Sequence, residues 1–353
     1  MNIGIIGGGQ LGMMLAEAAI QLNHHVFCID PNPNASIKQV NATHICAPFN
    51  DEEAFEKLNS LCDVFLYEFE NVDAQLLRKY KSKVIQKIDA LELSKNRLKE
   101  KELAASLAIP TVQYYEVNHQ RDLNNAMFPS ILKTQTEGYD GKGQLRLHSK
   151  EDLKTIRVNK KMILESMLDF DEEISIIVSR DKQNHTVFYP PIKNIHAEGI
   201  LVSSIPMWDY NPTRKKKLYQ YSKAIVDKLD YVGTMAIEYF VKGNTVYFNE
   251  IAPRPHNSGH FSIEGTTISQ FENMILATTN QAVIAPKKTK ESSMINVLGS
   301  TLHYLDRAKT FPQAHIHDYG KEIAQPKRKM AHITLLCDSI EELLKIENAI
   351  KDC

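Results

Sequence analysis

The first thirty residues of the chain alternate a strand, a glycine turn, a helix and a second strand. Residues 2–6 are apolar and predict a buried strand, and residues 10–22 predict a helix. Gly7–Gly12 joins them with the pattern G-x-G-x-x-G, which allows a tight turn and leaves backbone N–H groups open to an anion. The second predicted strand, residues 25–29, ends at Asp30. The sequence therefore predicts a βαβ start.

This glycine turn has more than one interpretation. A nicotinamide-dependent oxidoreductase would use Gly7–Gly12 and Asp30 as cofactor ligands. The fingerprint alone is weak, because any phosphate-bearing ligand can use the same helix end. It also leaves unexplained a second glycine-rich stretch, Gly138–Gln144, and a pair of glutamates, Glu238 and Glu250. The oxidoreductase is therefore kept only as an alternative.

A second glycine-rich stretch follows an apolar strand that ends at Lys133. It reads Gly138-Tyr139-Asp140-Gly141-Lys142-Gly143-Gln144. Its glycines let the backbone approach an anion closely, and Lys133 and Lys142 supply positive charge. The stretch predicts a loop that wraps a polyphosphate, the alternative being an exposed hairpin turn.

Two glutamates lie on a predicted antiparallel hairpin. Lys242-Gly243-Asn244 is a turn signal, and a three-residue loop centred on Asn244 would place Glu238 opposite Glu250 on one face of the sheet. Carboxylates this close repel unless a cation lies between them, and hard oxygen ligands favour Mg²⁺. Asn249 would join them only through a bulge or twist. Apolar flanking residues argue against the alternative, two solvated glutamates on an exposed hairpin.

Two smaller patterns are compatible with ligand binding. His256 and His260 have i, i+4 spacing, but Pro253 and Pro255 predict a loop, so a hydrogen bond from His256 to a substrate is favoured over zinc. The basic pair Arg328-Lys329 predicts either a surface patch or an anion pocket, and the local sequence does not separate the two.

Length and charge limit the class of protein. A chain of 353 residues predicts about two or three domains, and a charged run from Leu91 to Ala108 predicts one exposed helix ending at a domain junction before Pro110. The net charge of -1 argues against binding to nucleic acid or an anionic membrane. The start lacks the pattern of a signal peptide, and five scattered cysteines fit reduced thiols in the cytoplasm.

Together these stretches resemble the ATP-grasp ligases, and among them the purine-biosynthesis ligases that carboxylate 5-aminoimidazole ribonucleotide. The resemblance runs nearly the full length of the chain. The matching stretches are Gly7–Gly12, Tyr67–Asn71, Gly138–Gln144, Arg328–Met330 and, most specifically, Asn249–His260. It implies an α/β (α+β) ATP-grasp fold with a Rossmann-like N-terminal domain, a mobile lid domain and a C-terminal domain with the metal site. The expected domains are residues 1–95, 96–168 and 169–353.

The resemblance also implies a reaction. ATP would phosphorylate bicarbonate to carboxyphosphate, which breaks down to carbon dioxide beside the substrate amine and yields N5-carboxyaminoimidazole ribonucleotide for IMP synthesis. Mg²⁺ and lysines would stabilise charge on the transferring phosphoryl group, and lid closure would exclude water. The partners implied are these small molecules. The resemblance also implies a homodimer, with a second copy of the chain as partner, and a location in the cytoplasm.

Positions carried over from the family divide into four groups. For ATP they are Arg97, Lys133, Gly138, Tyr139, Asp140, Gly141, Lys142, Gly143, Gln144, Glu165, Ser166, Met167, Leu168, Glu173, His196, Asn249 and Glu250. For the ribonucleotide they are Glu70, Tyr139, Asp140, Arg254, His256, Asn257, Lys321, Arg328 and Lys329. Magnesium ligation is implied for Glu238 and Glu250, and catalytic roles for Asp140, Lys142 and Arg254, with Asp140 orienting or deprotonating the amine. Glu70 is less certain because Glu68 lies on the same face of the predicted strand.

Some positions depart from the family pattern. Glu137 stands where a glycine is common and adds negative charge near the phosphates, and Ala331 replaces a common glycine after the basic pair. Two alternatives within this fold remain: a related ligase such as formate-dependent glycinamide ribonucleotide transformylase, and a non-catalytic nucleotide-binding subunit. Both glutamates argue against the second.

Overall fold

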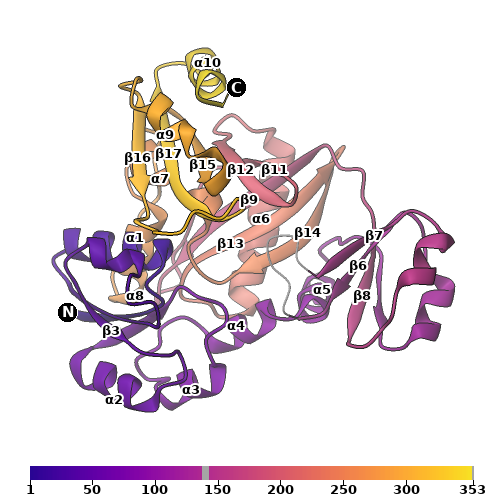
Figure 1. The fold of residues 1–353 in the computed structure, drawn as a ribbon, viewed down its shortest axis with the longest axis horizontal. Coiled ribbons are helices and arrows are strands. Elements are labelled where there is room, and N and C mark those ends of the chain that lie inside the picture. Colours follow the sequence, from indigo (N-terminus) through magenta and orange to yellow (C-terminus); the bar gives the residue numbers. More distant parts are fainter. Residues whose placement is uncertain (137–142, 352–353) are drawn as a thin grey trace.

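The computed structural model describes residues 1–136 and 143–351 and combines three β-sheets with helices packed around them (Figure 1). The mixed helix-and-strand class predicted from the sequence is confirmed. None of the helices in these two ranges is long and apolar enough to cross a membrane.

The N-terminal sheet is parallel and has the strand order β3-β2-β1-β4. Its strands are β1 (Asn2–Ile6), β2 (His25–Asp30), β3 (Ala42–Cys46) and β4 (Val64–Tyr67). Its helical segments are α1 (Gln10–Gln21), η1 (Ser36–Gln39), α2 (Glu52–Leu61), α3 (Ala74–Lys79) and α4 (Ile88–Ser94). The predicted βαβ start is therefore present. Apolar residues of β1 and α1 pack in one cluster with Phe271 and Met274 of α8 (Gln270–Thr278), so this sheet shares a core with the rest of the protein.

The helix predicted from Leu91 to Ala108 is divided in two. α4 ends at Ser94, and a new helix, α5 (Arg97–Ser106), begins after Asn96. The side chain of Asn96 accepts hydrogen bonds from the backbone N–H groups of Leu98 and Lys99. This N-cap satisfies amides that would otherwise be unpaired at a helix start, which explains the break.

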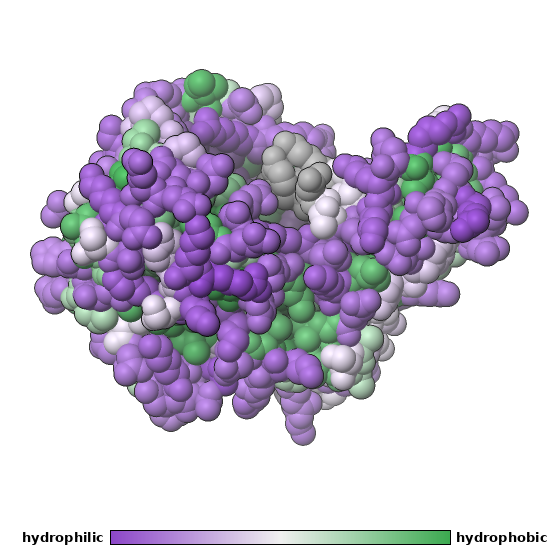
Figure 2. Space-filling view, turned by 90° about the horizontal axis from the view of Figure 1, so that it is seen from below, coloured by the Kyte–Doolittle hydropathy of each residue, from purple (hydrophilic) through white to green (hydrophobic). Residues whose placement is uncertain are grey.

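A second, smaller sheet projects from the body of the molecule, at the right of Figure 1 and Figure 2. It is antiparallel with the order β5-β8-β6-β7. Its elements are β5 (Tyr114–Val117), η2 (Gln120–Asn125), β6 (Ser130–Thr134), β7 (Gln144–Leu147), η3 (Lys150–Thr155) and β8 (Met162–Ser166). Its apolar side chains form a cluster of their own, so the sheet is built as a separate packing unit.

The third sheet is antiparallel and contains nine strands in the described part of the chain. Its order is β14-β13-β9-β11-β12-β15-β17-β16, and β10 pairs with β9. The strands are β9 (Glu172–Arg180), β10 (Thr186–Phe188), β11 (Ile192–Ala197), β12 (Ile200–Pro206), β13 (Gly233–Lys242), β14 (Thr245–Ala252), β15 (Glu291–Leu298), β16 (Ala314–Asp318) and β17 (Lys329–Cys337). The strands after Pro286 continue this sheet through pairing of β12 with β15. β14 and β16 lie at the two ends of this strand order.

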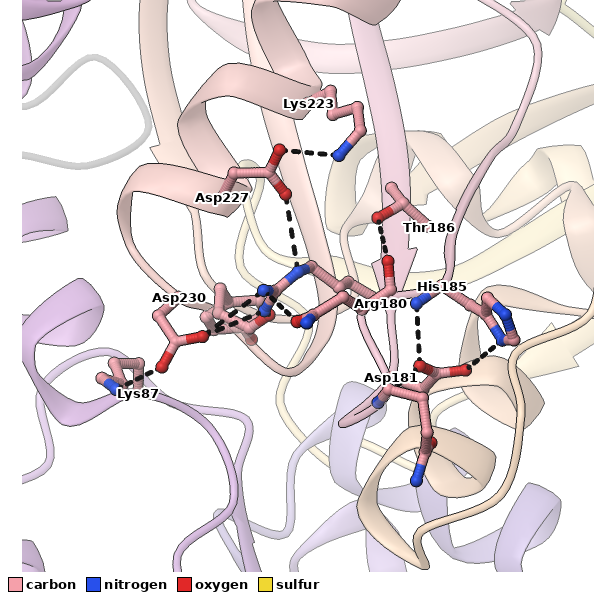
Figure 3. Close-up of polar contacts among 11 residues, drawn as sticks. Lys87, Arg180, Asp181, His185, Thr186, Lys223, Asp227 and Asp230 are labelled. Carbon is pink, nitrogen blue, oxygen red and sulfur yellow. Dashed lines mark hydrogen bonds and ion pairs between the residues drawn. The ribbon is translucent and has the colours of Figure 1, made fainter.

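Helices cover this sheet, and a network of ion pairs joins it to the N-terminal segment. The remaining helical segments are α6 (Pro212–Lys228), η4 (Asn257–Gly259), α7 (Ser262–Gly265), η5 (Gly299–Thr301), α9 (His303–Ala308) and α10 (Ile340–Lys351). Arg180, at the end of β9, donates a hydrogen bond to the carbonyl of Tyr231 at 2.7 Å and lies 3.4 Å from Asp230 (Figure 3). Asp230 in turn pairs with Lys87 at 2.9 Å, just before α4.

Candidate active site

The two predicted carboxylates lie opposite one another on the β13–β14 hairpin. Glu238 pairs with Glu250, as predicted, whereas the next residue of β13, Tyr239, pairs with Phe248. Asn249 is therefore an extra residue on β14, which is the arrangement of a β-bulge. Asn249 was expected to join the glutamates only if the strand has a bulge or twist there, and the bulge is present.

The turn of this hairpin is shorter than the three-residue loop predicted around Asn244. Lys242 pairs directly with Thr245, so only Gly243 and Asn244 connect the strands. Gly243 has a φ of 55°, which glycine adopts without strain. The shorter turn shifts the register by one residue, and the bulge at Asn249 shifts it back. The two differences cancel, which is why the predicted pairing of the glutamates is still correct.

Acidic and imidazole groups gather around Glu238. Burial and then the charge of Glu250 raise the pKa of Glu238 far above that of an ordinary carboxyl. The Nδ1 atom of His196 on β11 lies 2.5 Å from Oε2 of Glu173 on β9. Burial alone would lower the pKa of His196, but the hydrogen bond and charge of Glu173 raise it. His256 Nε2 is 3.5 Å from Oε1 of Glu238, and burial followed by the charge of nearby cations lowers its pKa well below its usual value.

The donor set of this hairpin fits magnesium. Glu238 and Glu250 offer carboxylate oxygens, and the raised pKa of Glu238 shows that their proximity is unfavourable until a cation or proton relieves it. Among the described residues no group of three or more His, Cys, Asp or Glu side chains could hold a metal ion. Mg²⁺ is commonly bound by one or two carboxylates together with phosphate oxygens of a nucleotide, so two glutamates are a sufficient protein contribution.

Beside the hairpin, a buried carboxylate is held between two lysines. Lys133 Nζ, on β6, lies 2.6 Å from Glu165 Oε2 at the end of β8, and Lys101 Nζ of α5 lies 3.5 Å from Oε1 of the same carboxylate. Burial would raise the pKa of Glu165, but Lys101 and Lys133 together lower it to about 2. Arg97, at the start of α5, donates to the carbonyl of Thr134 at 2.8 Å. The structure thus brings together Arg97, Lys133 and Glu165, three of the positions that the family resemblance implies for ATP.

Sequence reasoning did not identify Glu100 and Lys101 at this site. Both are almost fully buried, at 3% and 2% exposure, although they are charged. The signal that was available is their spacing: with Arg97 and Ala104 they recur at i, i+3, i+4 and i+7, which places all four on one face of α5. Because Arg97 was assigned to the site, its neighbours on the same face could have been assigned with it.

Several other positions that the resemblance implies for ATP lie on or next to the small sheet. Ser166 ends β8, and its N–H donates to the carbonyl of Gln113 at 2.8 Å, while Met167 and Leu168 lead from β8 towards β9. Gly143 O accepts a hydrogen bond from Thr134 N at 3.0 Å, and Gln144 begins β7. The predictions for Gly138, Tyr139, Asp140, Gly141 and Lys142, and the departure at Glu137, lie outside the described residues.

A second group of side chains lies where the segment after β14 meets the N-terminal sheet. Arg254 pairs with Glu70 across 2.8 Å. His256 Nδ1 is 2.8 Å from the hydroxyl of Ser258, which fixes the orientation of the ring. Asn257 is 7% exposed, yet neither polar atom of its side chain has a hydrogen-bond partner within the described part of the chain. A buried amide without a protein partner is the arrangement expected of a group that binds a ligand.

Three basic residues converge on the same region from the end of the chain. Lys321 Nζ donates to Gln10 Oε1 at 2.8 Å and to the carbonyl of Lys329 at 2.7 Å, so it joins α1 to β17. Burial, with the charges of Arg328 and Lys329, lowers the pKa of Lys321 to about 8. Arg328 donates to the carbonyl of Ile323 at 2.9 Å. Such a concentration of positive charge, partly buried, favours an anion pocket over the alternative of a surface patch.

The glycine turn at the N-terminus is occupied by the protein's own carboxylates. Gly8 N donates to Asp30 Oδ2 at 2.7 Å, and Gly9 N donates to Glu68 Oε1 at 3.1 Å. Strand β4 ends at Tyr67, so Glu68 leaves the strand and turns back to the glycines, contrary to the expectation that it shares a strand face with Glu70. Burial raises the pKa of Glu68 to about 7. These contacts argue against a dinucleotide in the turn.

Comparison with known families agrees with this geometry. Residues 1–94 match the ribonucleotide synthetase preATP-grasp domain, residues 102–271 the ATP-grasp domain, and residues 292–346 the phosphoribosylaminoimidazole carboxylase C-terminal domain. The fold and the site therefore define an ATP-grasp ligase. The N5-carboxyaminoimidazole ribonucleotide synthase of Staphylococcus haemolyticus is 38% identical over 98% of this chain and 95% of its own length. That of Staphylococcus aureus (strain COL) is 36% identical over 97% and 94%. The chain belongs to the N5-carboxyaminoimidazole ribonucleotide synthase family.

Solved structures of this family have the same fold. An N5-carboxyaminoimidazole ribonucleotide synthetase in complex with ADP superposes with a TM-score of 0.94, at 36% identity, over 99% of this chain and 96% of that one. The Aspergillus clavatus enzyme, in complex with ADP and 5-aminoimidazole ribonucleotide, gives a TM-score of 0.91 at 27% identity over 100% and 99%. The predicted family and ATP-grasp fold are thereby confirmed.

Proposed function

We propose that this enzyme couples ATP hydrolysis to carboxylation of 5-aminoimidazole ribonucleotide by bicarbonate, giving N5-carboxyaminoimidazole ribonucleotide for purine biosynthesis. The observation that carries the proposal is the division of charge in the site. Glu238 and Glu250 suit a magnesium–nucleotide complex, whereas the basic residues Lys321, Arg328 and Lys329, of which Lys329 lies near Glu238, suit a phosphate monoester. Relatives that bind ADP and aminoimidazole ribonucleotide support this pairing of ligands.

On the nucleotide side, Glu238 and Glu250 would hold Mg²⁺, with Asn249 beside them. When bound, the metal would neutralise charge on the transferring γ-phosphoryl group. Lys133 supplies a further positive charge, and Glu165 holds it in place at 2.6 Å. We assign Arg97, Glu173, His196 and the segment from Glu165 to Leu168 to ATP, and extend the same assignment to Gly138, Tyr139, Asp140, Gly141, Lys142, Gly143 and Gln144.

On the substrate side, the carboxylate of Glu70 orients Arg254, and the guanidinium would bind the ribonucleotide. The neutral ring of His256 and the unpaired amide of Asn257 would recognise its polar groups, and the basic residues at the end of the chain its phosphate. Asp140 would orient or deprotonate the amine that attacks carbon dioxide released from carboxyphosphate. Tyr139, Asp140 and Lys142 enter through the family resemblance.

The organisation of the molecule follows from the same assignment. We propose a Rossmann-like domain over residues 1–95, a mobile lid over residues 96–168 and a C-terminal domain over residues 169–353. The separate core of the small sheet supports a mobile unit over its own strands, because a unit with its own packing can move as one body, whereas Leu103 and Ala104 of α5 pack with the C-terminal sheet. A homodimer in the cytoplasm is the assembly and location that we propose from the family.

One assay tests the function directly. ADP release should depend on both aminoimidazole ribonucleotide and bicarbonate, and the carboxylated product should appear in equal amount. ADP release that needs formate and glycinamide ribonucleotide would instead assign the chain to the related transformylase. Reduction of NAD or NADP without ATP turnover would revive the oxidoreductase.

A further inference from the structure

Helix α5 closes the open edge of the strand that carries Glu250. β14 is an outer strand of its sheet, so one side of its backbone has no neighbouring strand to pair with. Pro110 O accepts from Phe248 N at 2.7 Å on that side. Lys101 Nζ then donates to Asn249 O at 3.0 Å, and Glu100 Oε1 accepts from Ile251 N at 2.9 Å. Two adjacent side chains of α5 therefore form hydrogen bonds with the backbone of Asn249 and Ile251, the residues on either side of Glu250.

The spacing of these contacts fits only the bulged form of the strand. In a regular strand the amides that face outward recur at every second residue. Phe248 and Ile251, whose amides both face outward, are three residues apart, because Asn249 adds one residue between them. The contacts from Glu100, Lys101 and Pro110 taken together are thus complementary to the strand with the bulge and not to one without it.

Lys101 also connects this strand to the small sheet. Its ammonium lies 3.5 Å from Glu165 at the end of β8 and 5.7 Å from the centre of the Phe248 ring. Burial of charged groups is costly, and a buried ion pair is weak evidence for a role in stability alone. Two charged side chains buried at the edge of the strand that carries Glu250 are better explained by a role in its geometry.

We propose that Glu100 and Lys101 are positioning residues that hold Asn249, Glu250 and Ile251 in the bulged register and so aim Glu250 at Glu238. Through its ion pair with Glu165, Lys101 also connects β14 to β8 of the small sheet. The proposal rests on the metal role assigned to Glu238 and Glu250 in the proposed function.

The test measures Mg²⁺ affinity by calorimetric titration into enzyme saturated with a non-hydrolysable ATP analogue. Lys101→Met should weaken Mg²⁺ binding by about tenfold or more, the usual loss when a group that orients a metal ligand is removed. Lys101→Arg, which keeps a cationic donor, should recover part of it. Lys99→Met, on the exposed side of the same helix, is the matched control and should bind as wild type does. The steady-state KM for the ribonucleotide should stay the same in all three.

A second pair of variants keeps the proposal falsifiable if Lys101→Met does not fold. Glu100→Gln retains an oxygen that can accept from Ile251 N and should bind Mg²⁺ normally, whereas Glu100→Leu should not. Unchanged Mg²⁺ affinity in folded Lys101→Met or in Glu100→Leu overturns the positioning role. If wild type and Glu250→Gln bind Mg²⁺ equally, the metal site itself is wrong, so the two failures are distinguishable.

Discussion

The amide of Gly9 donates a hydrogen bond to Oε1 of Glu68 at 3.1 Å, so the first glycine turn already holds a carboxylate. The neighbouring amide of Gly8 is held by Asp30 in the same way. A pyrophosphate would have to displace both side chains from the backbone amides that would bind it.

We therefore expect no saturable binding of NAD or NADP at millimolar concentration. Fluorescence or calorimetric titration of the purified enzyme measures this, with the ATP analogue as the positive control. Tight binding of either dinucleotide would show that the turn opens to admit a cofactor, and the oxidoreductase would regain its place.

Substitution of Glu250 tests the metal site. Glu250→Gln removes one charge from a residue whose side chain is exposed, so the fold should be retained. Turnover should fall by about a hundredfold or more, the scale of losing one electrostatic stabiliser. Glu53→Gln, an exposed carboxylate of α2, should have no effect. A purified Glu250→Gln enzyme with near-normal turnover would remove this residue from the site.

The basic region should bind the ribonucleotide phosphate and not ATP. Arg328→Ala should raise the KM for aminoimidazole ribonucleotide by about tenfold, or about 1.4 kcal/mol of binding, while leaving the calorimetric Kd for the ATP analogue unchanged. The reason is that Arg328 lies beside Lys321 and Lys329, whereas we assign Lys133, which pairs with Glu165, to the nucleotide. Weaker ATP binding with an unchanged ribonucleotide KM would reverse our assignment of the two phosphate sites.

The pH dependence of ribonucleotide capture should report on Lys321. Burial and neighbouring cations lower its pKa to about 8, so its side chain is a charged ammonium below that pH and a neutral amine above it. Because kcat/KM reflects groups of the free enzyme, kcat/KM for the ribonucleotide should decline above about pH 8, by up to about tenfold per pH unit. Lys321→Arg should abolish this decline, since a guanidinium stays charged. A profile that is flat to pH 9.5 in wild type would exclude Lys321 from phosphate binding.

A stack of buried imidazoles should make the fold sensitive to acid. His332 is fully buried, accepts or donates a hydrogen bond with Tyr319 at 2.8 Å, and stacks on His317 with ring centres 4.3 Å apart. Burial and then the charge of His260 lower its pKa well below 6.5, so the folded protein keeps the ring neutral while the unfolded chain binds a proton. Stability is therefore lost as the pH falls below about 6.5.

Proton uptake on unfolding measures this contribution. At pH 5.5, His332→Gln should take up about one proton fewer than wild type when unfolding is followed by calorimetry in buffers of different ionisation enthalpy. Equal uptake in the His332 variant would mean that this imidazole is already protonated in the folded enzyme.

Short-range patterns allowed much of this fold to be predicted. The strand, glycine turn and helix at the start follow from alternation and turn residues close together in the sequence. The pairing of Glu238 with Glu250 was predicted correctly because the shorter turn and the bulge offset one another. The break between α4 and α5 was missed because a single N-cap, Asn96, outweighs a continuous charged run.

The contacts made between distant segments could not be read in the same way. Glu68 was placed on a strand face, but it turns to an amide 59 residues earlier in the chain. Glu100 accepts from an amide 151 residues later, and nothing near it in the sequence indicates that an unpaired strand edge will lie there. Such groups become visible only when packing brings an uncovered backbone beside them.

The extra residue in β14 has a consequence for how the gene can change. The residues on either side of Asn249 already have partners on β13, Phe248 with Tyr239 and Glu250 with Glu238. Deletion of Asn249 would leave a regular ladder in which all the remaining side chains of the hairpin keep their cross-strand partners and their face of the sheet. The strand pairing therefore does not require this residue, so a requirement for it would come from contacts at the bulge, such as that of Lys101 Nζ with Asn249 O.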